Sequence, residues 1–469
     1  MPKEKNSNKH IIVNSYKELI DVVKKAPNNS KEIRLKNITI CFDLDFNKFL
    51  REGNFAKVTN NDNEVPTIEV AHLIVLDNVS CDKIDFTNIA FENSICIYGI
   101  EDQTTINNIC FYGCKINCPQ HISNPIALEI SNVKIIDKLI LENCIFYSFV
   151  LFYSIKLNRQ KNIDIIDCIF RQYVRFEHIL LYPKSILNIC GEKASFAQDL
   201  MFYNCTIAGY LDIRSEITGN LRLYKINYLI EKKYQVGLLS LQDVFIGQAL
   251  RFLNCNINTI DIVNTQINDI YEYNLNYRTL KTDASVVFRA AAIKNNNEFL
   301  IQKYTATVYD ERLKEGLSKP KTNVFKKKKN TPIIILYELL NKYIWEPIIL
   351  LINSFYSREK LLLWLNKYSN DYNRSWIRGI WFTAITTLIF YFILNYFGLV
   401  KPVFVIDWKF NNFRIVSEGY LSLIDIFNLS GSNFDFQTNT LGKYITFFAR
   451  IFIAYGIYQT IYAFYKYKK

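Results

Sequence analysis

Two long apolar stretches near the C-terminus constrain this chain most. Residues 376–400 carry no formal charge after Arg378, and residues 444–465 carry a single one, Arg450. A helix needs about 20 apolar residues to cross the hydrocarbon core of a bilayer, so both stretches are long enough. Basic residues flank them: Arg374, Arg378, Lys466, Lys468 and Lys469. This pattern predicts a transmembrane hairpin with both ends in the cytoplasm, the alternative being two buried helices of a soluble core.

The positive charge is concentrated in the same part of the chain. The formal net charge is +12, and 25 of the 56 Lys and Arg residues but only 12 of the 44 Asp and Glu residues lie from Val286 onward. A basic surface beside membrane helices favours contact with anionic lipid. The part before Val286 is close to neutral, which argues against a general nucleic-acid-binding domain there.

The cysteines indicate a reduced compartment. All 11 lie between Cys41 and Cys255, and residues 1–15 are polar and charged. We therefore expect no signal peptide, and free thiols in a cytosolic N-terminal domain. No histidine–cysteine set in the sequence would complete a zinc site with Cys110, Cys114 and Cys118. We therefore expect no metal and no other cofactor.

A short phrase recurs through the N-terminal part. It consists of an apolar lead-in, a polar or small residue, Cys, one further residue and an apolar residue, and it surrounds Cys114, Cys144, Cys168, Cys205 and Cys255. Cys144, Cys168 and Cys190 are spaced by 24 and 22 residues, about one coil of a three-sided parallel β-solenoid. Inward cysteines at equivalent corners would stack, with Asn or Asp at the turns. An antiparallel β-sandwich is the alternative.

These observations predict an order of parts. A capping box at Ser15 and Glu18 opens a short helix. We expect a cap helix in residues 1–30, an irregular right-handed parallel β-helix in 31–284, a helical adaptor and basic linker in 285–330, interfacial helices in 331–370 and the hairpin in 371–469. Residues 333–352 contain Glu338, Lys342 and Glu346, which favours a helix at the membrane surface over a third span. The linker is expected to contact lipid headgroups through Lys326, Lys327, Lys328 and Lys329.

The hairpin contains polar residues that suit a channel. Arg450 lies within a span, where a charge usually faces a protein interior or water, and Asp425 in the short segment 419–430 is its candidate partner. That segment is expected to be a re-entrant or surface helix. A further polar stripe either lines a pore or packs helices, and it comprises Tyr455, Tyr458, Gln459, Tyr462, Thr383, Thr386 and Thr387. One hairpin cannot enclose a pore, so we expect a homo-oligomer, most simply a tetramer.

The order of parts resembles known bacterial proteins. The irregular solenoid resembles the pentapeptide-repeat and right-handed β-helix proteins. The segment that follows is similar to the helix joining such a solenoid to a membrane hairpin, with Phe288, Arg289, Asn295 to Asn297, Tyr304 and Tyr309 in the matching places. The whole plan resembles membrane effectors of anti-phage defence, particularly the Hailong-type channel.

The resemblance implies a ligand and a location. In that family a partner nucleotidyltransferase makes short single-stranded DNA that holds a channel of the inner membrane shut. A nucleotide or DNA oligomer is thus the expected ligand here, and its candidate contacts are Arg171, Tyr173, Arg175, Phe176 and Lys184. The four histidines are scattered and the sequence has no nucleophile or phosphate-loop motif, so we expect no enzyme. A membrane-anchored scaffold without conductance is the alternative function.

Overall fold

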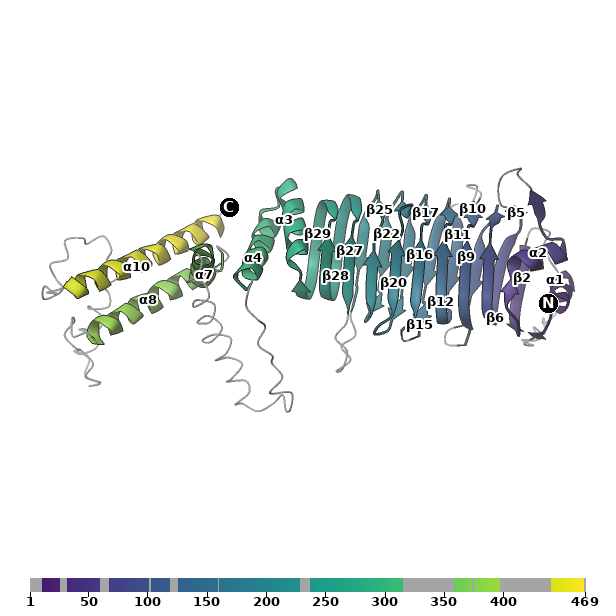
Figure 1. Ribbon diagram of the computed structural model, residues 1–469, viewed down its shortest axis with the longest axis horizontal. Helices are drawn as coiled ribbons and strands as arrows, with labels where there is room; N and C mark the ends of the chain where they lie inside the picture. Colours follow the sequence, from purple (N-terminus) through teal and green to yellow (C-terminus); the bar gives the residue numbers. More distant parts are fainter. Residues whose placement is uncertain are drawn as a thin grey trace, which may run out of the picture. The chain divides into compact units, whose positions relative to one another are not determined.

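The chain forms two compact units, Met1–Asn297 and Glu298–Lys469. Figure 1 shows the computed structural model, whose description covers residues 11–25, 32–59, 67–100, 103–118, 125–158, 160–227, 237–314, 358–372, 375–396 and 440–467. The first unit is a stack of short parallel strands closed by helices, and the second is helical. The β-solenoid predicted from the sequence is therefore confirmed.

Each coil of the solenoid contributes to four parallel ladders of strands. Ladder A contains β2 (Glu32–Ile40), β6 (Leu73–Thr87), β8 (Ile95–Tyr98), β11 (Ile126–Ser131), β14 (Phe149–Tyr153), β18 (Val174–Glu177), β22 (Leu200–Tyr203), β26 (Leu221–Tyr224), β28 (Phe245–Val263) and β29 (Gln266–Leu280). Ladder B contains β1 (Ile11–Val13), β9 (Thr105–Tyr112), β12 (Lys134–Glu142), β15 (Lys156–Leu157), β19 (Leu180–Leu181), β23 (Thr206–Ile207) and parts of β2, β6, β28 and β29.

Ladders C and D complete each coil. Ladder C contains β3 (Leu44–Asp45), β16 (Asn162–Ile166), β20 (Ile186–Cys190), β24 (Tyr210–Ile213), β27 (Leu238–Gln242) and parts of β6, β9, β12, β28 and β29. Ladder D contains β5 (Thr67–Val70), β7 (Ile89–Phe91), β10 (Lys115–Ile116), β13 (Ile145–Phe146), β17 (Ile169–Phe170), β21 (Ser195–Phe196), β25 (Glu216–Ile217) and parts of β28 and β29. β4 (Lys57–Thr59) pairs antiparallel with β5.

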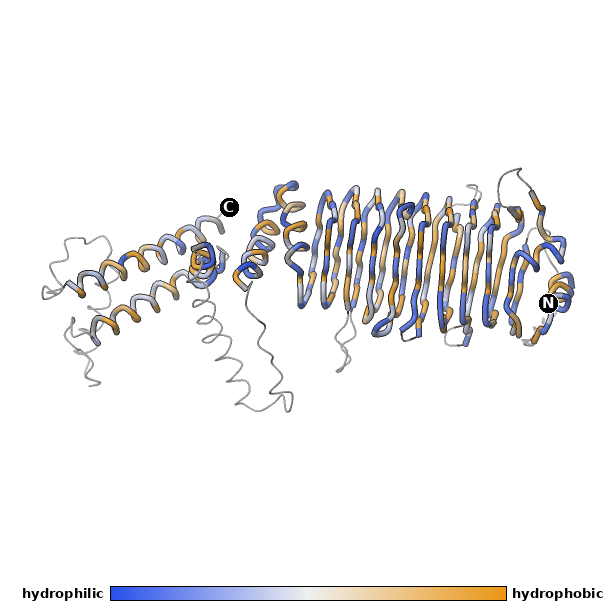
Figure 2. The backbone as a smooth tube through the Cα atoms, viewed as in Figure 1, coloured by the Kyte–Doolittle hydropathy of each residue, from blue (hydrophilic) through white to orange (hydrophobic). Residues whose placement is uncertain are grey.

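The three-sided coil expected from the sequence is wrong, because four ladders surround the core. The error has a physical origin. Most strands that belong to ladder D alone are only two residues long, so they leave no alternation to count in the sequence. Figure 2 shows how hydrophilic and hydrophobic residues alternate along the strands. In β20, for example, Leu187 and Ile189 are buried, whereas Asn188 points outward.

The recurring cysteine phrase marks corners of the coil. Asn143 and Asp167 have left-handed backbones with φ of 53° and 52°, which Asn and Asp adopt more readily than most residues. The cysteines that follow them, Cys144 and Cys168, are fully buried, and Ile145 and Ile169 donate their backbone N–H groups to the carbonyls of Cys114 and Cys144 in the preceding coils. The predicted cysteine ladder thus exists for Cys114, Cys144 and Cys168 at the corner between ladders C and D. Cys190 is not part of it, because it lies at an outward position of β20 in ladder C. Cys205 and Cys255 instead follow ladder A, so the phrase marks two different corners.

Aromatic stacks fill the core, and helices cover the open ends of the solenoid. Phe170 lies between Phe146 and Phe196, with ring centroids 5.0 and 4.8 Å away and nearly parallel planes. At the N-terminal end, α1 (Tyr16–Lys25) and α2 (Phe46–Gly53) bury their apolar faces. At the other end, α3 (Thr282–Lys294) places Phe288 6.0 Å from Phe252. Exposed coil ends would invite further strand pairing, and these helices prevent it.

The second unit contains α4 (Glu298–Lys314), α7 (Arg358–Asn370), α8 (Trp376–Tyr396) and α10 (Thr440–Tyr467). α8 and α10 pack antiparallel, because Trp376 contacts Phe464 and Phe390 contacts Phe452. Among the described residues, Thr440–Tyr465 is the one helical segment long and apolar enough to cross a membrane, and Trp376–Phe390 is apolar but shorter. The predicted segments 319–330, 333–352 and 419–430 lie outside the described residues.

Candidate functional site: an Arg–Tyr face and a helix pair

The outward positions of ladder A form two columns of side chains. The parallel register aligns Arg175, Met201, Arg222, Arg251 and Tyr271 in one column. The second column contains Glu177, Tyr203, Tyr224, Leu253 and Tyr273. Neighbouring strands lie about 4.8 Å apart, so each column presents a side chain at that interval. We call the set Arg175, Tyr203, Arg222, Tyr224, Lys225, Arg251, Tyr271 and Tyr273 the Arg–Tyr face.

Hydrogen bonds hold two of these arginines in place. The buried Asn220 donates its amide to Asp199 and to Gln248, both at 2.8 Å. Its own oxygen accepts a hydrogen bond from Arg251 Nε at 3.1 Å. The second carboxylate oxygen of Asp199 pairs with Arg222 at 2.5 Å. Because one network fixes both guanidinium groups, they are ordered before any ligand arrives.

Cations lie over tyrosine rings on this face. Arg175 is 5.2 Å from the Tyr203 ring centroid, and Arg251 is 5.0 Å from that of Tyr271. The rings of Tyr203 and Tyr224 stack at 4.9 Å, with Lys225 within 6 Å of both. Such cation–π contacts keep the charge at the surface while ordering its side chain. An ordered surface of flat rings and cations suits a ligand with flat rings and negative charge.

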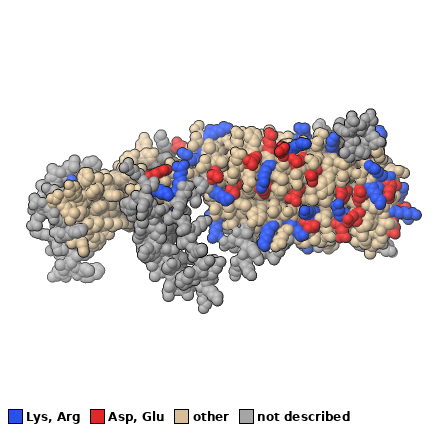
Figure 3. Space-filling view, in the orientation of Figure 1, with Lys and Arg blue, Asp and Glu red and all other residues tan. Residues whose placement is uncertain are grey.

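Acidic residues moderate the charge of the face. Arg175 pairs with Glu177 at 2.6 Å, and Arg222 pairs with Asp199. Arg251 has a neutral amide and a ring as partners, and Lys225 lies over rings. Figure 3 shows Lys and Arg interspersed with Asp and Glu over the visible side of the solenoid. This mixture does not favour a general attraction of polyanions.

The structure separates the ligand contacts predicted from sequence. Arg175 belongs to the Arg–Tyr face, and the half-buried Tyr173 packs 4.2 Å from Phe149 beside it. Arg171 is exposed just after β17. Phe176 is a correction, because its ring is fully buried between Phe152 and Phe202 in the core. Lys184 lies in the turn between ladders B and C, with φ of 70°, and so is not part of this face.

Sequence reasoning missed Arg222, Arg251 and the tyrosines beside them. They lie 47 and 76 residues after Arg175, in coils of unequal length. A fixed repeat would have shown in the sequence that these arginines share a column, but the length of this repeat varies from coil to coil. The available signal was the outward position of each residue within its own strand.

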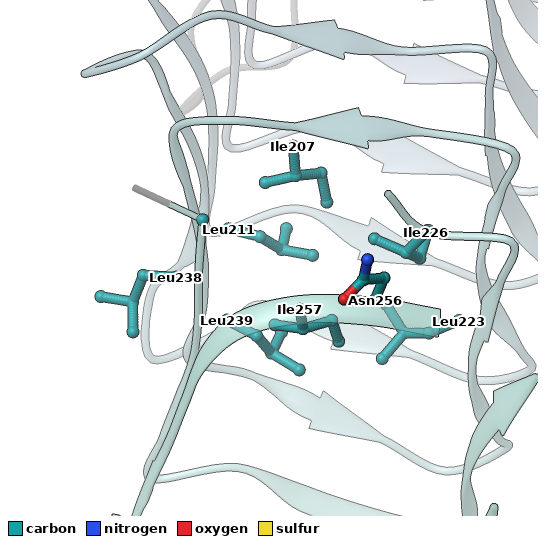
Figure 4. A pocket seen from close by; sticks show the side chains of 9 residues that line it. Ile207, Leu211, Leu223, Ile226, Leu238, Leu239, Asn256 and Ile257 are labelled. Carbon is teal, nitrogen blue, oxygen red and sulfur yellow. The ribbon is translucent and has the colours of Figure 1, made fainter. Parts of the chain in front are cut away.

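A small apolar cavity lies in the solenoid near β24 and β27. Figure 4 shows side chains from ladders A, B and C around it, with Asn256 as the polar group and Leu238 on the outer side of its strand. The cavity volume is about 10 Å³, which is the space of one water molecule at most. This cavity is too small for an organic ligand. Among the described residues no three His, Cys, Asp or Glu side chains are grouped as metal ligands.

In the helical unit, small residues bring α8 and α10 close together. A Cβ added to Gly456 would lie 2.4 Å from Thr383 Oγ1, and one added to Gly379 would lie 2.3 Å from Thr460 Oγ1. Thr383 and Thr387 donate their hydroxyls to carbonyls one turn earlier, at 2.9 and 2.7 Å. Glycine and threonine at such contacts are typical of helix packing in membranes. Thr383 and Thr387 are therefore packing residues of this pair.

The polar stripe predicted on α10 is partly in contact with α7 and partly exposed. Tyr455 donates to Asn366 Oδ1 at 2.7 Å, and Gln459 donates to the same atom at 3.3 Å, so both contact α7. Tyr458 and Tyr462 lie on the adjacent part of the helix surface, 60% and 43% exposed, with ring centroids 6.0 Å apart. Their role in lining a pore stays a prediction.

Arg450 is the eleventh residue of α10, about 15 Å from the start of the helix at 1.5 Å per residue. It is half-buried, and within the described part of the chain it takes part in no ion pair. Its predicted partner Asp425, and the predicted lipid contacts Lys326, Lys327, Lys328 and Lys329, lie outside the described residues.

The fold defines the chain as a parallel β-solenoid protein with a C-terminal helical unit. No protein-family model matches the chain, and neither does any curated protein or solved structure.

Proposed function

We propose that this protein is a ligand-gated ion channel of the bacterial inner membrane, with the solenoid as its cytosolic sensor. The observation that carries the proposal is the apolar surface left over after α8 and α10 have packed together. Trp381, Phe447 and Ile461 remain 63%, 60% and 62% exposed. Many further large apolar side chains of both helices are also exposed.

Such a surface is unstable in water. Soluble proteins rarely expose apolar patches beyond a few hundred Å², and lipid tails remove the penalty. α10 is long enough to span the bilayer, and α8 is proposed as the second span. Arg378 in the first turn of α8 and Lys466 near the end of α10 support a cytoplasmic location of both termini by the positive-inside rule.

Arg450 supports conduction over simple anchoring. A guanidinium near the middle of a span is costly in lipid, by roughly 3 kcal/mol on insertion scales. A second copy of the chain, or a water-filled path between copies, would lower that cost. Because two helices cannot enclose a pore, the proposed channel is a cyclic homo-oligomer, with a tetramer as the expected state.

The chemistry of the Arg–Tyr face supports a nucleotide or a short single-stranded DNA as the ligand. Ordered guanidinium groups next to tyrosine rings match phosphates next to bases, as in a nucleotide or a short single-stranded DNA. The proposed source is a partner nucleotidyltransferase, as the resemblance to Hailong-type effectors implies. The same resemblance extends the proposal to anti-phage defence.

Reconstitution tests the proposal directly. The full-length protein is extracted in detergent, and its oligomeric state is measured by light scattering. It is then placed in phosphatidylethanolamine–phosphatidylglycerol liposomes loaded with a potassium-sensitive dye. We expect a ring of several subunits and a potassium flux that a short single-stranded DNA alters.

Two variants test whether the potassium flux depends on the proposed span. Arg450→Ala is expected to change the flux, whereas Arg214→Ala, on the ladder C side of the solenoid beside Asp212, is the matched control. Release of the protein from membranes by alkaline carbonate would contradict the proposal that α8 and α10 span the membrane. A monomer that stays in the membrane and passes no ions contradicts the channel and favours the membrane-anchored scaffold.

A further inference from the structure

α7 packs against α4 through a buried apolar cluster. Leu363 of α7 and Tyr372, two residues after its end, form this cluster with Ala306 and Leu313 of α4, and all four residues are less than a tenth exposed. The rings of Tyr309 and Tyr372 lie 5.5 Å apart at the edge of this cluster. Movement of α4 therefore displaces α7 unless these contacts break.

An ion pair fastens the same two helices. Lys367 Nζ lies 3.2 Å from Asp310 Oδ1, with the side chains 16% and 29% exposed. Burial, and then the negative charge of Asp310, raise the pKa of Tyr372 next to the pair. A second pair, Arg312 with Glu359 at 3.4 Å, is 52% and 70% exposed, so water screens it strongly.

The residue before Lys367 connects α7 to α10. Asn366 Oδ1 accepts the hydrogen bonds of Tyr455 and Gln459, and the Gln459 side chain is 7% exposed. Asparagine is a poor residue for a helix interior, because its amide competes with the backbone for hydrogen bonds. Its place here is explained by the two donors that it satisfies.

We propose that α7 is the transmission helix of this protein, with the Asp310–Lys367 pair as its input and Asn366 as its output to α10. Residues 366 and 367 are adjacent on one helix, so a displacement received at the ion pair reaches the Asn366 amide without passing through a flexible segment. The inference rests on the proposed function, since α4 follows the last solenoid helix in sequence and α10 is the proposed span. Its test is a direct measurement of the coupling between α4 and α10.

Hydrogen–deuterium exchange of the full chain in detergent micelles supplies that measurement. Asp310→Asn removes the ion pair and is expected to speed amide exchange about threefold or more in α7 and also around residues 455–459 of α10. Glu359→Gln is the matched control, because it removes the exposed ion pair between the same two helices. It is expected to leave the exchange of α10 unchanged.

A third variant separates transmission from general loosening. In an Asn366→Leu background, Asp310→Asn is expected to speed exchange in α7 without a further change in α10. Unchanged α10 exchange in Asp310→Asn, or an equal increment in the Asn366→Leu background, overturns the inference. Should Asp310→Asn fail to fold, Lys367→Met removes the same pair. Exchange requires no ion flux, so a silent channel in liposomes would contradict the proposed function alone.

Discussion

The Arg–Tyr face gives a quantitative prediction for single-stranded DNA. Arg175, Arg222 and Arg251 span three coil steps, about 14 Å at 4.8 Å per step, which accommodates two or three nucleotides. Arg175 and Arg222 already pair with carboxylates, so Lys225 and Arg251 supply most of the free positive charge.

The salt dependence of binding follows from these two cations, Lys225 and Arg251. Each phosphate neutralised on a single strand contributes a slope of about −0.7 to log K against log salt, so two cations give about −1.4. Arg251→Ala is expected to reduce the magnitude of the slope to about 0.7. Tyr271→Ala is expected to leave the slope unchanged and to weaken binding by about 1–3 kcal/mol, the usual contribution of one stacked base.

Fluorescence anisotropy of a labelled oligothymidylate measures both effects, using the full chain in detergent at 50 to 300 mM salt. Arg214→Ala is the control, because it removes another exposed arginine, from the ladder C side. Identical slopes for Arg251→Ala and the unchanged protein would refute the reasoning. Equal weakening by Arg214→Ala would show that only the overall charge of the solenoid matters.

Three predictions concern the fold. The corner residue Asn143 has a left-handed backbone, so Asn143→Gly is expected to be tolerated and Asn143→Val to lower the free energy of unfolding by about 1–2 kcal/mol. Thermal unfolding measures the difference, and equal stability of the two variants contradicts this. Phe170→Ala is expected to lower the free energy of unfolding by about 3–5 kcal/mol, and a loss below 1 kcal/mol in urea denaturation argues against the stack. Burial raises the pKa of the Cys205 thiol to about 12 from its ordinary 9.0, so the folded chain holds a proton that the unfolded chain loses. This contribution to stability is present below about pH 9 and is lost as the pH rises towards 12, so the fall in stability between pH 8 and 11 is expected to be smaller in Cys205→Ala.

Much of the solenoid was readable from local chemistry. The residues before the corner cysteines have left-handed backbones, as the Asn and Asp in the phrase predicted. The alignment of Cys114, Cys144 and Cys168 in successive coils also follows from the phrase. These features depend on one residue and its immediate neighbours, and such local preferences are written in the sequence.

The number of sides of the solenoid and the membership of the Arg–Tyr face were not predicted from the sequence. A strand of two residues, such as β13 or β17, leaves no period in the sequence, so the fourth ladder was invisible. Phe176 and Arg175 are adjacent, yet one lies in the core and the other on the surface. That difference follows from the strand pleat, which turns adjacent side chains to opposite faces. Which outward side chains share a column depends instead on the coils between them, whose unequal lengths are aligned only when the coils stack.

The helical unit shows the same division. The sequence by itself determined where long apolar segments lie and that Arg450 interrupts one of them. Only the tertiary structure decided that Tyr455 and Gln459 contact Asn366 while Tyr458 and Tyr462 remain exposed. The physical reason is that apolarity is a property of each residue alone, whereas the side of a helix that becomes buried depends on the helices that pack against it.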